Sequence, residues 1–126
     1  MAFFVKANVV HMGDHFFKDR FPFIDISSGG NAKQFTANLK AALERVDDAT
    51  VIVPGHGSLA NKADLQRYLN MLETTSALVT NKLDQGASVD QITEQGLGEE
   101  WSSWGQGFIK EALWIQFIAQ SQSRSR

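Results

Sequence analysis

The residues with the clearest chemical potential lie in two short motifs, Gly13-Asp14 and Pro54-Gly55-His56-Gly57. Each motif follows an apolar, strand-like run, residues 8–12 in the first case and residues 50–53 in the second. A carboxylate and an imidazole at the ends of two strands could meet at one sheet edge, and both groups bind divalent cations such as zinc. The glycines on both sides of the histidine allow positive φ and a close backbone approach. The pair therefore indicates half of a metal site.

The same residues also allow a structural interpretation, in which Asp14 caps a turn and His56 forms a hydrogen bond within its loop. A two-metal hydrolase needs several histidines and acids, whereas the chain has three histidines, His11, His15 and His56. His15 is adjacent to Asp14 and is a possible substitute ligand or a residue that packs its loop. Strand alternation places His11 on the opposite face from Met12, and we expect His11 to be a core or hydrogen-bonded residue.

The composition and net charge of the chain limit the kinds of molecule that we expect it to bind. The chain has 126 residues, 43% hydrophobic and 21% charged, with a formal net charge of -2 and no cysteine. This length fits one domain, and the charge gives no electrostatic basis for binding nucleic acid. Without cysteine, any metal must be held by nitrogen and oxygen ligands. No apolar run approaches the ~20 residues that cross a bilayer, and Lys6 interrupts the apolar start too early for a signal peptide. We expect a cytoplasmic protein that binds neither membranes nor nucleic acid.

The elements that must position these residues alternate between strand and helix. We expect strands at residues 3–5, 8–12 and 50–53, with a further strand in the aromatic stretch 16–26. Helical spacing of apolar residues predicts helices from Asn31 to about residue 46, from Asn61 to about Gly86, at 88–95 and at 108–119. The fold class is therefore α/β, in one domain over residues 1–120, with a disordered polar tail at 121–126.

Longer stretches around the two motifs match a known pattern. They are Asn8-Val9-Val10-His11-Met12-Gly13-Asp14-His15-Phe16-Phe17, then Phe21-Pro22-Phe23-Ile24-Asp25 with Ser28-Gly29-Gly30, then Val53-Pro54-Gly55-His56-Gly57, and finally Trp101, Trp104-Gly105 and Gly107-Phe108-Ile109. In order and spacing they resemble the C-terminal half of metallo-β-lactamase-fold hydrolases. The resemblance covers about residues 2–119.

This resemblance implies one αβ half of an αββα sandwich, with extra C-terminal helices. In the family, the aspartate that matches Asp14 bridges two zinc ions, and the histidine that matches His56 binds the second ion. The other ligands come from a His-x-His-x-Asp-His motif and a further histidine in the N-terminal half, and this chain has none of them. We therefore expect weak zinc binding by Asp14 and His56, with His15 as the possible substitute.

The resemblance also places aromatic residues beside a substrate groove. The residues that it would place there are Phe16, Phe17, Phe23, Trp101 and Trp104. Aromatic side chains beside a proline are more often core or interface anchors, and we favour that role for the phenylalanine cluster. The two tryptophans either cover the groove or fasten the last helix.

Three functions are compatible with these residues. In the first, the chain is a metallo-β-lactamase-like hydrolase fragment with part of a two-metal zinc site, inactive alone and completed by a missing N-terminal half. In the second, it is a non-catalytic homodimeric module in which two similar halves cover each other's apolar sheet face. In the third, it is a small enzyme whose site combines Asp14, His15 and His56 from two subunits. Whether the chain is an enzyme therefore stays open.

Overall fold

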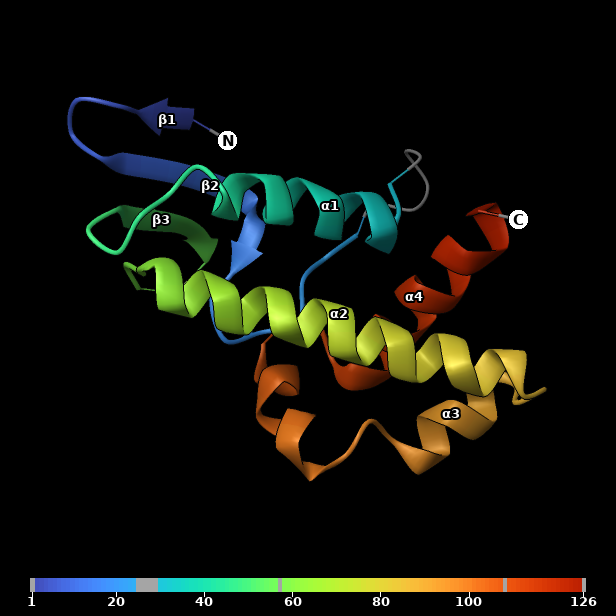
Figure 1. Cartoon of the computed structure of the whole chain (residues 1–126). Coiled ribbons are helices and arrows are strands. Elements are labelled where there is room, and N and C mark those ends of the chain that lie inside the picture. Colours follow the sequence, from blue (N-terminus) through green and yellow to red (C-terminus); the bar gives the residue numbers. More distant parts are fainter. Residues whose placement is uncertain (1, 25–29, 57, 108, 126) are drawn as a thin grey trace.

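A computed structural model of the chain describes residues 2–24, 30–56, 58–107 and 109–125, without the side chains of Asp14, His15, His56 and residues 122–125. Its elements follow one another along the chain as in Figure 1. They are β1 (Ala2–Phe4), β2 (Val9–Phe17), α1 (Ala32–Leu43), β3 (Val51–His56), α2 (Lys62–Asp84), α3 (Val89–Gln95), the 3-10 helix η2 (Glu99–Gln106) and α4 (Glu111–Ser125). The mixed α/β class expected from the sequence is confirmed.

The sheet has three strands in the order β1-β2-β3. Strand β1 pairs antiparallel with β2, whereas β2 and β3 are parallel and are joined by the crossover helix α1. Parallel neighbours need such a crossover because a tight turn cannot return the chain to the same end of the sheet. Strand β2 continues past Met12 to Phe17, so the separate strand expected within residues 16–26 is not formed in the part that the structure describes, and residues 25 and 26 lie outside it.

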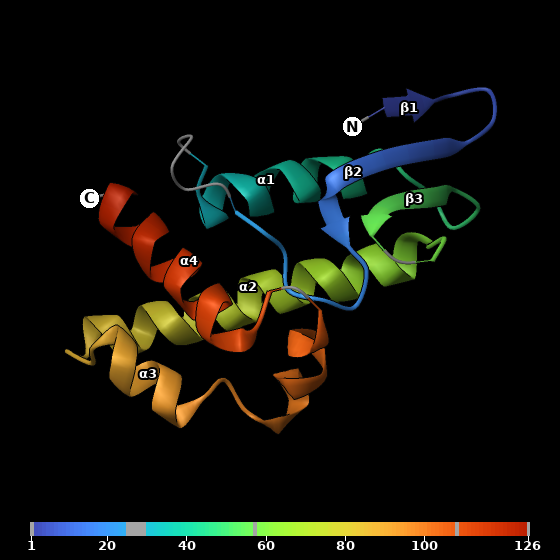
Figure 2. The same cartoon turned by 180° about the vertical axis from the view of Figure 1, so that it is seen from behind.

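The two faces of the sheet have different surroundings. On the inner face, Val10, Met12 and Ile52 are buried at 0%, 1% and 0% exposure in the core that includes residues of α1 and α2. Helix α1 passes in front of part of β2 in Figure 1, and β2 passes in front of α1 in the reverse view of Figure 2. His11 projects to the opposite face from Met12 and is exposed, so of its two expected roles, as a core residue or as a hydrogen-bonded one, the core role is wrong.

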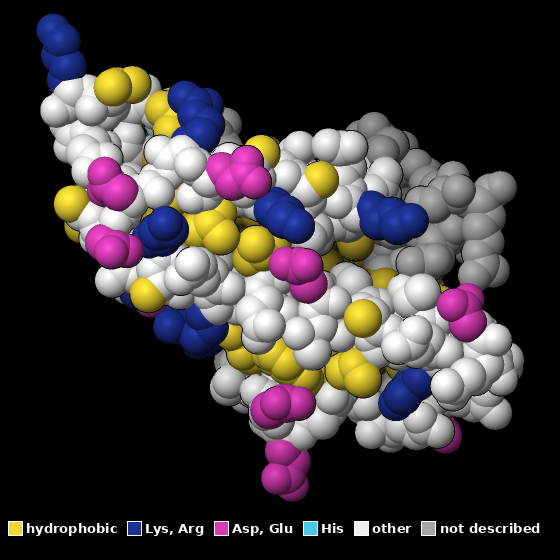
Figure 3. Space-filling model, in the orientation of Figure 1, with side chains coloured by type: hydrophobic (Ala, Val, Ile, Leu, Met, Phe, Trp, Pro, Cys, Tyr) yellow, Lys and Arg dark blue, Asp and Glu magenta, His cyan; other side chains and the backbone are white. Residues whose placement is uncertain are grey.

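Local capping signals define where the helices begin. At Asn61, where a helix was expected to start, Asn61 and Asp64 form a capping box, with Asn61 N donating to Asp64 Oδ2 at 3.0 Å and Asp64 N donating to Asn61 Oδ1 at 3.0 Å. Ser88 caps α3 in the same reciprocal way with Gln91. The aliphatic stripe of α2 faces the core as expected, with Leu65, Leu69, Leu72 and Val79 buried. Hydrophobic side chains gather in the seam between α1 and α2 in Figure 3, with charged groups on the flanking ridges.

The C-terminal region is more helical than its sequence suggests. The segment that carries the tryptophans, where no helix was expected, forms η2, and the last helix begins at Glu111, not at Phe108, which lies outside the described residues. Helix α4 also continues to Ser125, and Ser121 is buried at 3% exposure. Ser121 Oγ accepts a hydrogen bond from Ala32 N at 2.7 Å. Ser121 therefore belongs to α4 and is bonded to the start of α1, in place of the disordered tail expected from this residue onward.

A buried hydrogen bond links α2 to α4 in the core. Trp114 Nε1 donates to Thr75 Oγ1 at 2.9 Å, and Thr75 Oγ1 donates to the carbonyl oxygen of Met71 at 2.7 Å. Trp114 and Thr75 are both at 0% exposure. Because the indole N–H of Trp114 is buried, the threonine hydroxyl supplies its acceptor.

Within the described ranges, no helix has the length and apolar character needed to cross a membrane.

We predict that Thr75→Val destabilises the fold by about 1–3 kcal/mol, because valine has a similar shape but leaves the buried indole N–H without an acceptor. Urea unfolding followed by tryptophan fluorescence measures this change. The matched control is Thr74→Val at the preceding position of α2. Thr74 is partly exposed, so this substitution should change stability by less than about 0.5 kcal/mol. Equal effects at the two positions would contradict the role given to the hydrogen bond.

Candidate functional site

The parallel pairing of β2 and β3 brings the two candidate metal ligands to one end of the sheet. Asp14 lies within β2 and His56 is the last residue of β3. The backbone register pairs Gly13 with Pro54 and Phe17 with His56. In open α/β sheets, the carboxyl ends of parallel strands are the usual place for ligands. The side chains of Asp14, His15 and His56 are outside the described atoms, so the site is defined here by its backbone.

Gly13 gives β2 the irregularity that precedes Asp14. Its φ is +56°, and the register shifts between His11 and Gly13 and again between Gly13 and Phe17. A Cβ at this position would meet no atom within 4 Å. Glycine is therefore favoured here by its backbone conformation and not by a lack of space, because L-residues with a Cβ rarely adopt this left-handed region.

Charged residues fasten the loop that follows His56 to the end of β2. Lys18 Nζ donates to Ser58 Oγ at 3.0 Å and to the Leu59 carbonyl oxygen at 3.1 Å, and it lies 3.8 Å from Asp64 Oδ2. The backbone of the same loop is tied to β3, since Ile52 and Ala60 exchange two hydrogen bonds of 2.9 Å. The loop is thus held from both sides.

A second ion pair extends this network along α2. Arg67 Nε donates to Asp19 Oδ1 at 3.1 Å, and Arg67 Nη2 lies 3.2 Å from Asp64 Oδ1. The hydrogen bond that Arg67 donates to Asp19, together with the charges of Asp19 and Asp64, raises the pKa of Arg67. Sequence reasoning missed Lys18, Asp19 and Arg67, because the contacts Lys18–Ser58 and Arg67–Asp19 join residues 40 and 48 positions apart and leave no spacing signal.

Polar residues at the opposite end of the strands fix where β3 begins beside β2. Asn8 Nδ2 donates to Asp47 Oδ1 at 3.1 Å, and Thr50 Oγ1 lies 2.8 Å from Asn8 Oδ1 and 3.1 Å from Asp47 Oδ1. The Ala49 N–H also donates to Asp47 Oδ1 at 2.9 Å. The hydrogen bond from Asn8, and then those from Thr50 and Ala49, hold the pKa of Asp47 below its ordinary 3.8.

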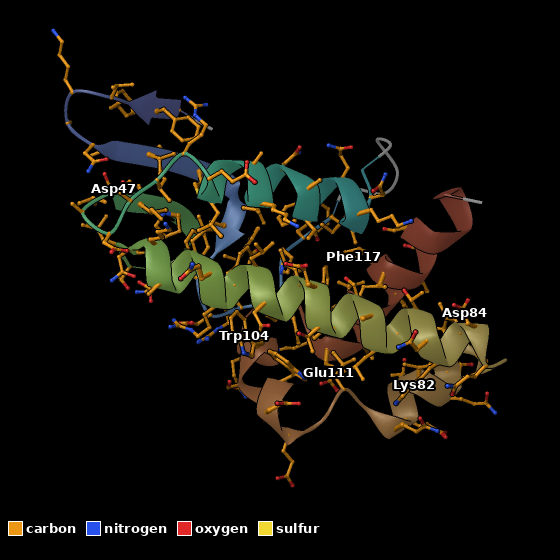
Figure 4. All side chains as sticks on the ribbon, in the orientation of Figure 1. Asp47, Lys82, Asp84, Trp104, Glu111 and Phe117 are labelled. Atoms are coloured by element: carbon orange, nitrogen blue, oxygen red, sulfur yellow. The ribbon has the colours of Figure 1, made fainter. Side chains whose placement is uncertain are left out.

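The aromatic residues expected beside a groove divide between core and surface. Phe16 is at 0% exposure, and its ring lies 4.9 Å from the Tyr68 ring in a tilted arrangement, while the Trp104 ring is stacked 6.4 Å from the same tyrosine. In Figure 4, Trp104 lies between η2 and α2. Trp101 and Trp104 are each 7% exposed, so both belong to the core of this chain. Tyr68, which packs against both Phe16 and Trp104, is itself buried, and this burial raises the pKa of its phenol.

The phenylalanines that follow β2 fasten the chain to the C-terminal helices. The Phe21 N–H donates to the Trp104 carbonyl oxygen at 2.9 Å, and the Phe21 ring stacks 6.0 Å from that of Trp114. Phe23 is 51% exposed and meets the Phe117 ring edge-on at 5.7 Å. Phe17 is partly exposed. Among the expected groove residues, Phe17 and Phe23 therefore keep accessible surface.

The ligand set in this chain does not complete a zinc site. Within the part of the chain that the structure describes, no three His, Cys, Asp or Glu side chains gather where they could hold a metal ion. Catalytic zinc sites use three protein ligands and leave one position for water. Asp14 and His56 supply two, and a third would have to be His15 or come from another polypeptide.

One cavity lies among the helices, away from the strand ends. A cavity of about 240 Å³ opens between α1, α2 and α4, lined by residues that include Lys33, Glu73 and Ser76. None of its described lining residues belongs to β2, β3 or the loop after His56. The cavity is therefore separate from the strand ends that carry the candidate ligands.

Comparison of the chain with protein-family models gives no match, and no curated protein matches it. Its function is therefore argued from the residues and their placement.

We predict that Gly13→Ala destabilises the chain by about 1–2 kcal/mol, because the added Cβ is strained at positive φ even though the space around it is open. Gly13→Asn should cost less, since asparagine tolerates the left-handed region better than alanine. Chemical denaturation compares the three proteins. A larger loss for Asn than for Ala would show that side-chain volume, not φ, sets the requirement.

We also predict that the contribution of the Asp47 carboxylate to stability is lost in acid. Its pKa in the folded chain is lower than 3.8, so the contribution is complete above this ordinary pKa and is lost as the pH falls below it, through the folded pKa. Asp47→Asn keeps an acceptor oxygen and removes the charge. The stability difference from the wild type, measured by urea unfolding, should stay constant from about pH 6 to about pH 5 and shrink as the pH falls below about 4. The exposed neighbour Asp48 provides the control Asp48→Asn, and a difference that grows on acidification would contradict the assignment.

Proposed function

We propose that this chain is one αβ half of a metallo-β-lactamase-like hydrolase. It contributes Asp14 and His56 to a zinc site that a second, His-rich half completes, and it is not catalytically competent alone. One observation carries the proposal: β2 and β3 run parallel and end side by side, with Asp14 in the first strand and His56 at the end of the second. The choice of family is supported by the resemblance of the surrounding sequence motifs to metallo-β-lactamase-fold hydrolases.

The chemistry expected of the two residues differs. The two oxygens of the Asp14 carboxylate suit a bridge between cations, and the His56 imidazole suits one cation through a single nitrogen. Zinc held by a complete ligand set lowers the pKa of a bound water and so supplies a nucleophile near neutral pH. Because this chain offers two ligands of that set, its own part is to present the carboxylate and the imidazole at a fixed separation.

The outer face of the sheet supports the need for a second half. The register places Phe4 opposite Val9, and Val9 opposite Val51, in one row across the three strands. Phe4 is 56% exposed and Val51 is 39% exposed. The next row, which pairs Ala2 with His11 and His11 with Val53, also has no charged residue when His11 is neutral. An apolar sheet face without charges is ordinarily covered by another layer.

The same face favours a second candidate function, a non-catalytic homodimeric module. Two copies could pack these neutral rows against each other around a two-fold axis without bringing like charges together. In that case Asp14 and His56 would be structural residues, and zinc would have no effect on assembly. Solution mass and metal content separate this candidate from the half-site proposal.

We predict that zinc binds the isolated chain weakly, leaving well under one ion per chain after desalting, because two ligands do not hold it firmly. Isothermal titration should nevertheless detect binding that Asp14→Asn and His56→Gln each weaken ~10-fold or more. Asp48→Asn and His11→Gln remove the same kinds of group away from the strand ends and should leave zinc affinity unchanged.

Three results would contradict or redirect the proposal. Zinc affinity that is insensitive to both site variants would remove Asp14 and His56 from the site. A metal-free dimer by light scattering, with no response to zinc, would favour the structural module. A dimer that retains one or more zinc ions per subunit would favour an intersubunit site and would justify assays with lactam, thioester and phosphodiester substrates.

A further inference from the structure

The side chain of Lys18 bridges the ends of the two strands that carry Asp14 and His56. Lys18 lies in the turn directly after β2, and its ammonium reaches the loop between β3 and α2. It donates to Ser58 Oγ at 3.0 Å and to the Leu59 carbonyl oxygen at 3.1 Å. A third partner, Asp64 Oδ2, lies 3.8 Å away. The ammonium therefore makes two hydrogen bonds and one longer charge–charge contact.

This contact is more enclosed than an ordinary surface ion pair. The side chains of Lys18 and Asp64 are 18% and 19% exposed, whereas those of Arg67 and Asp19 in the neighbouring pair are 49% and 46% exposed. Exposed pairs are screened by water and constrain their surroundings little. Lys18 is therefore better placed than Arg67 to restrain the chain around it.

The position of Lys18 along the chain gives this restraint a consequence for the site. Lys18 is four residues after Asp14 in sequence, and Ser58 is two residues after His56. Consecutive Cα atoms are about 3.8 Å apart, so a link between Lys18 and Ser58 limits how far the two strand ends can separate. The backbone pair between Ile52 and Ala60 holds the loop to its own strand, and Lys18 supplies the link to the neighbouring one.

We propose that Lys18 is a positioning residue that sets the separation of Asp14 and His56 by clamping the Ser58–Leu59 segment to the end of β2. The inference rests on the proposed function for its consequence in metal binding. The contacts of the clamp involve neither Asp14 nor His56, so the clamp can be measured without adding zinc. Asp64 remains paired with Arg67 and with the Asn61 N–H when Lys18 is changed, so the start of α2 keeps its cap.

The first experiment tests the clamp without metal. Lys18→Met keeps the length of the aliphatic stem and removes all three donors. Amide hydrogen exchange of Ala60, which directly follows the clamped segment and whose N–H donates to the Ile52 carbonyl oxygen at 2.9 Å, should accelerate ~10-fold in this variant when it is read by NMR. Arg67→Met breaks the ion pair of the same network that does not touch the loop, and it should leave the exchange of Ala60 unchanged. Unchanged exchange in Lys18→Met would overturn the clamp.

The second experiment tests the consequence for the site. By zinc titration of the intact chain, Lys18→Met should weaken binding ~10-fold, whereas Arg67→Met should leave it unchanged and Lys18→Arg should restore part of the loss. If zinc affinity depends on Asp14 and His56 but not on Lys18, the positioning role is wrong and the proposed function stands. If zinc affinity is independent of Asp14 and His56, the proposed function fails, and the exchange measurement still decides whether Lys18 clamps the loop.

Discussion

The parallel pairing of β2 with β3 is the constraint on which the rest of this structure depends. It requires a crossover, which α1 provides, and a crossover puts a helical layer on one face of the sheet. The inner residues of the strands are then buried against that layer, whereas Phe4 and Val51 on the outer face stay exposed. The same pairing places the carboxyl ends of both strands together. A covered face, a bare face and a possible site at the strand ends therefore have a single cause.

Separate interactions hold the two ends of this strand pair. At the start, Asn8, Asp47 and Thr50 share hydrogen bonds that fix where β3 begins. At the other end, the ammonium of Lys18 reaches the loop after His56. Between these two ends, β2 and β3 are held together by backbone pairing, which is irregular at Gly13. Because side-chain contacts act at both ends, the strand ends are restrained where the proposed ligands lie, and the small sheet does not rely on its three strands alone.

Local sequence signals predicted much of the fold, and long-range contacts account for what they missed. Capping by Asn61 and by Ser88 needs residues three positions apart, and the helices expected to start at these residues are confirmed. The extension of β2 through Asp14 depends on a partner strand some 40 residues later, and the burial of Ser121 depends on α1. For the site, the position of His56 at the end of its strand follows from the sequence pattern, whereas Asp14 lies within β2, past the expected strand end. Lys18 could not be found from the sequence, since its partners are 40 and 41 residues away.

The central claim, that Asp14 and His56 form one half-site, is tested most directly by NMR of the imidazole rings during a zinc titration. The chain has three histidines, so each ring nitrogen can be assigned and followed separately. The account predicts that the His56 ring responds to zinc, that the response is lost in Asp14→Asn, and that the exposed His11 ring is unaffected. An equal response of His11 and His56, or a His56 response that survives the loss of the Asp14 carboxylate, would contradict the claim.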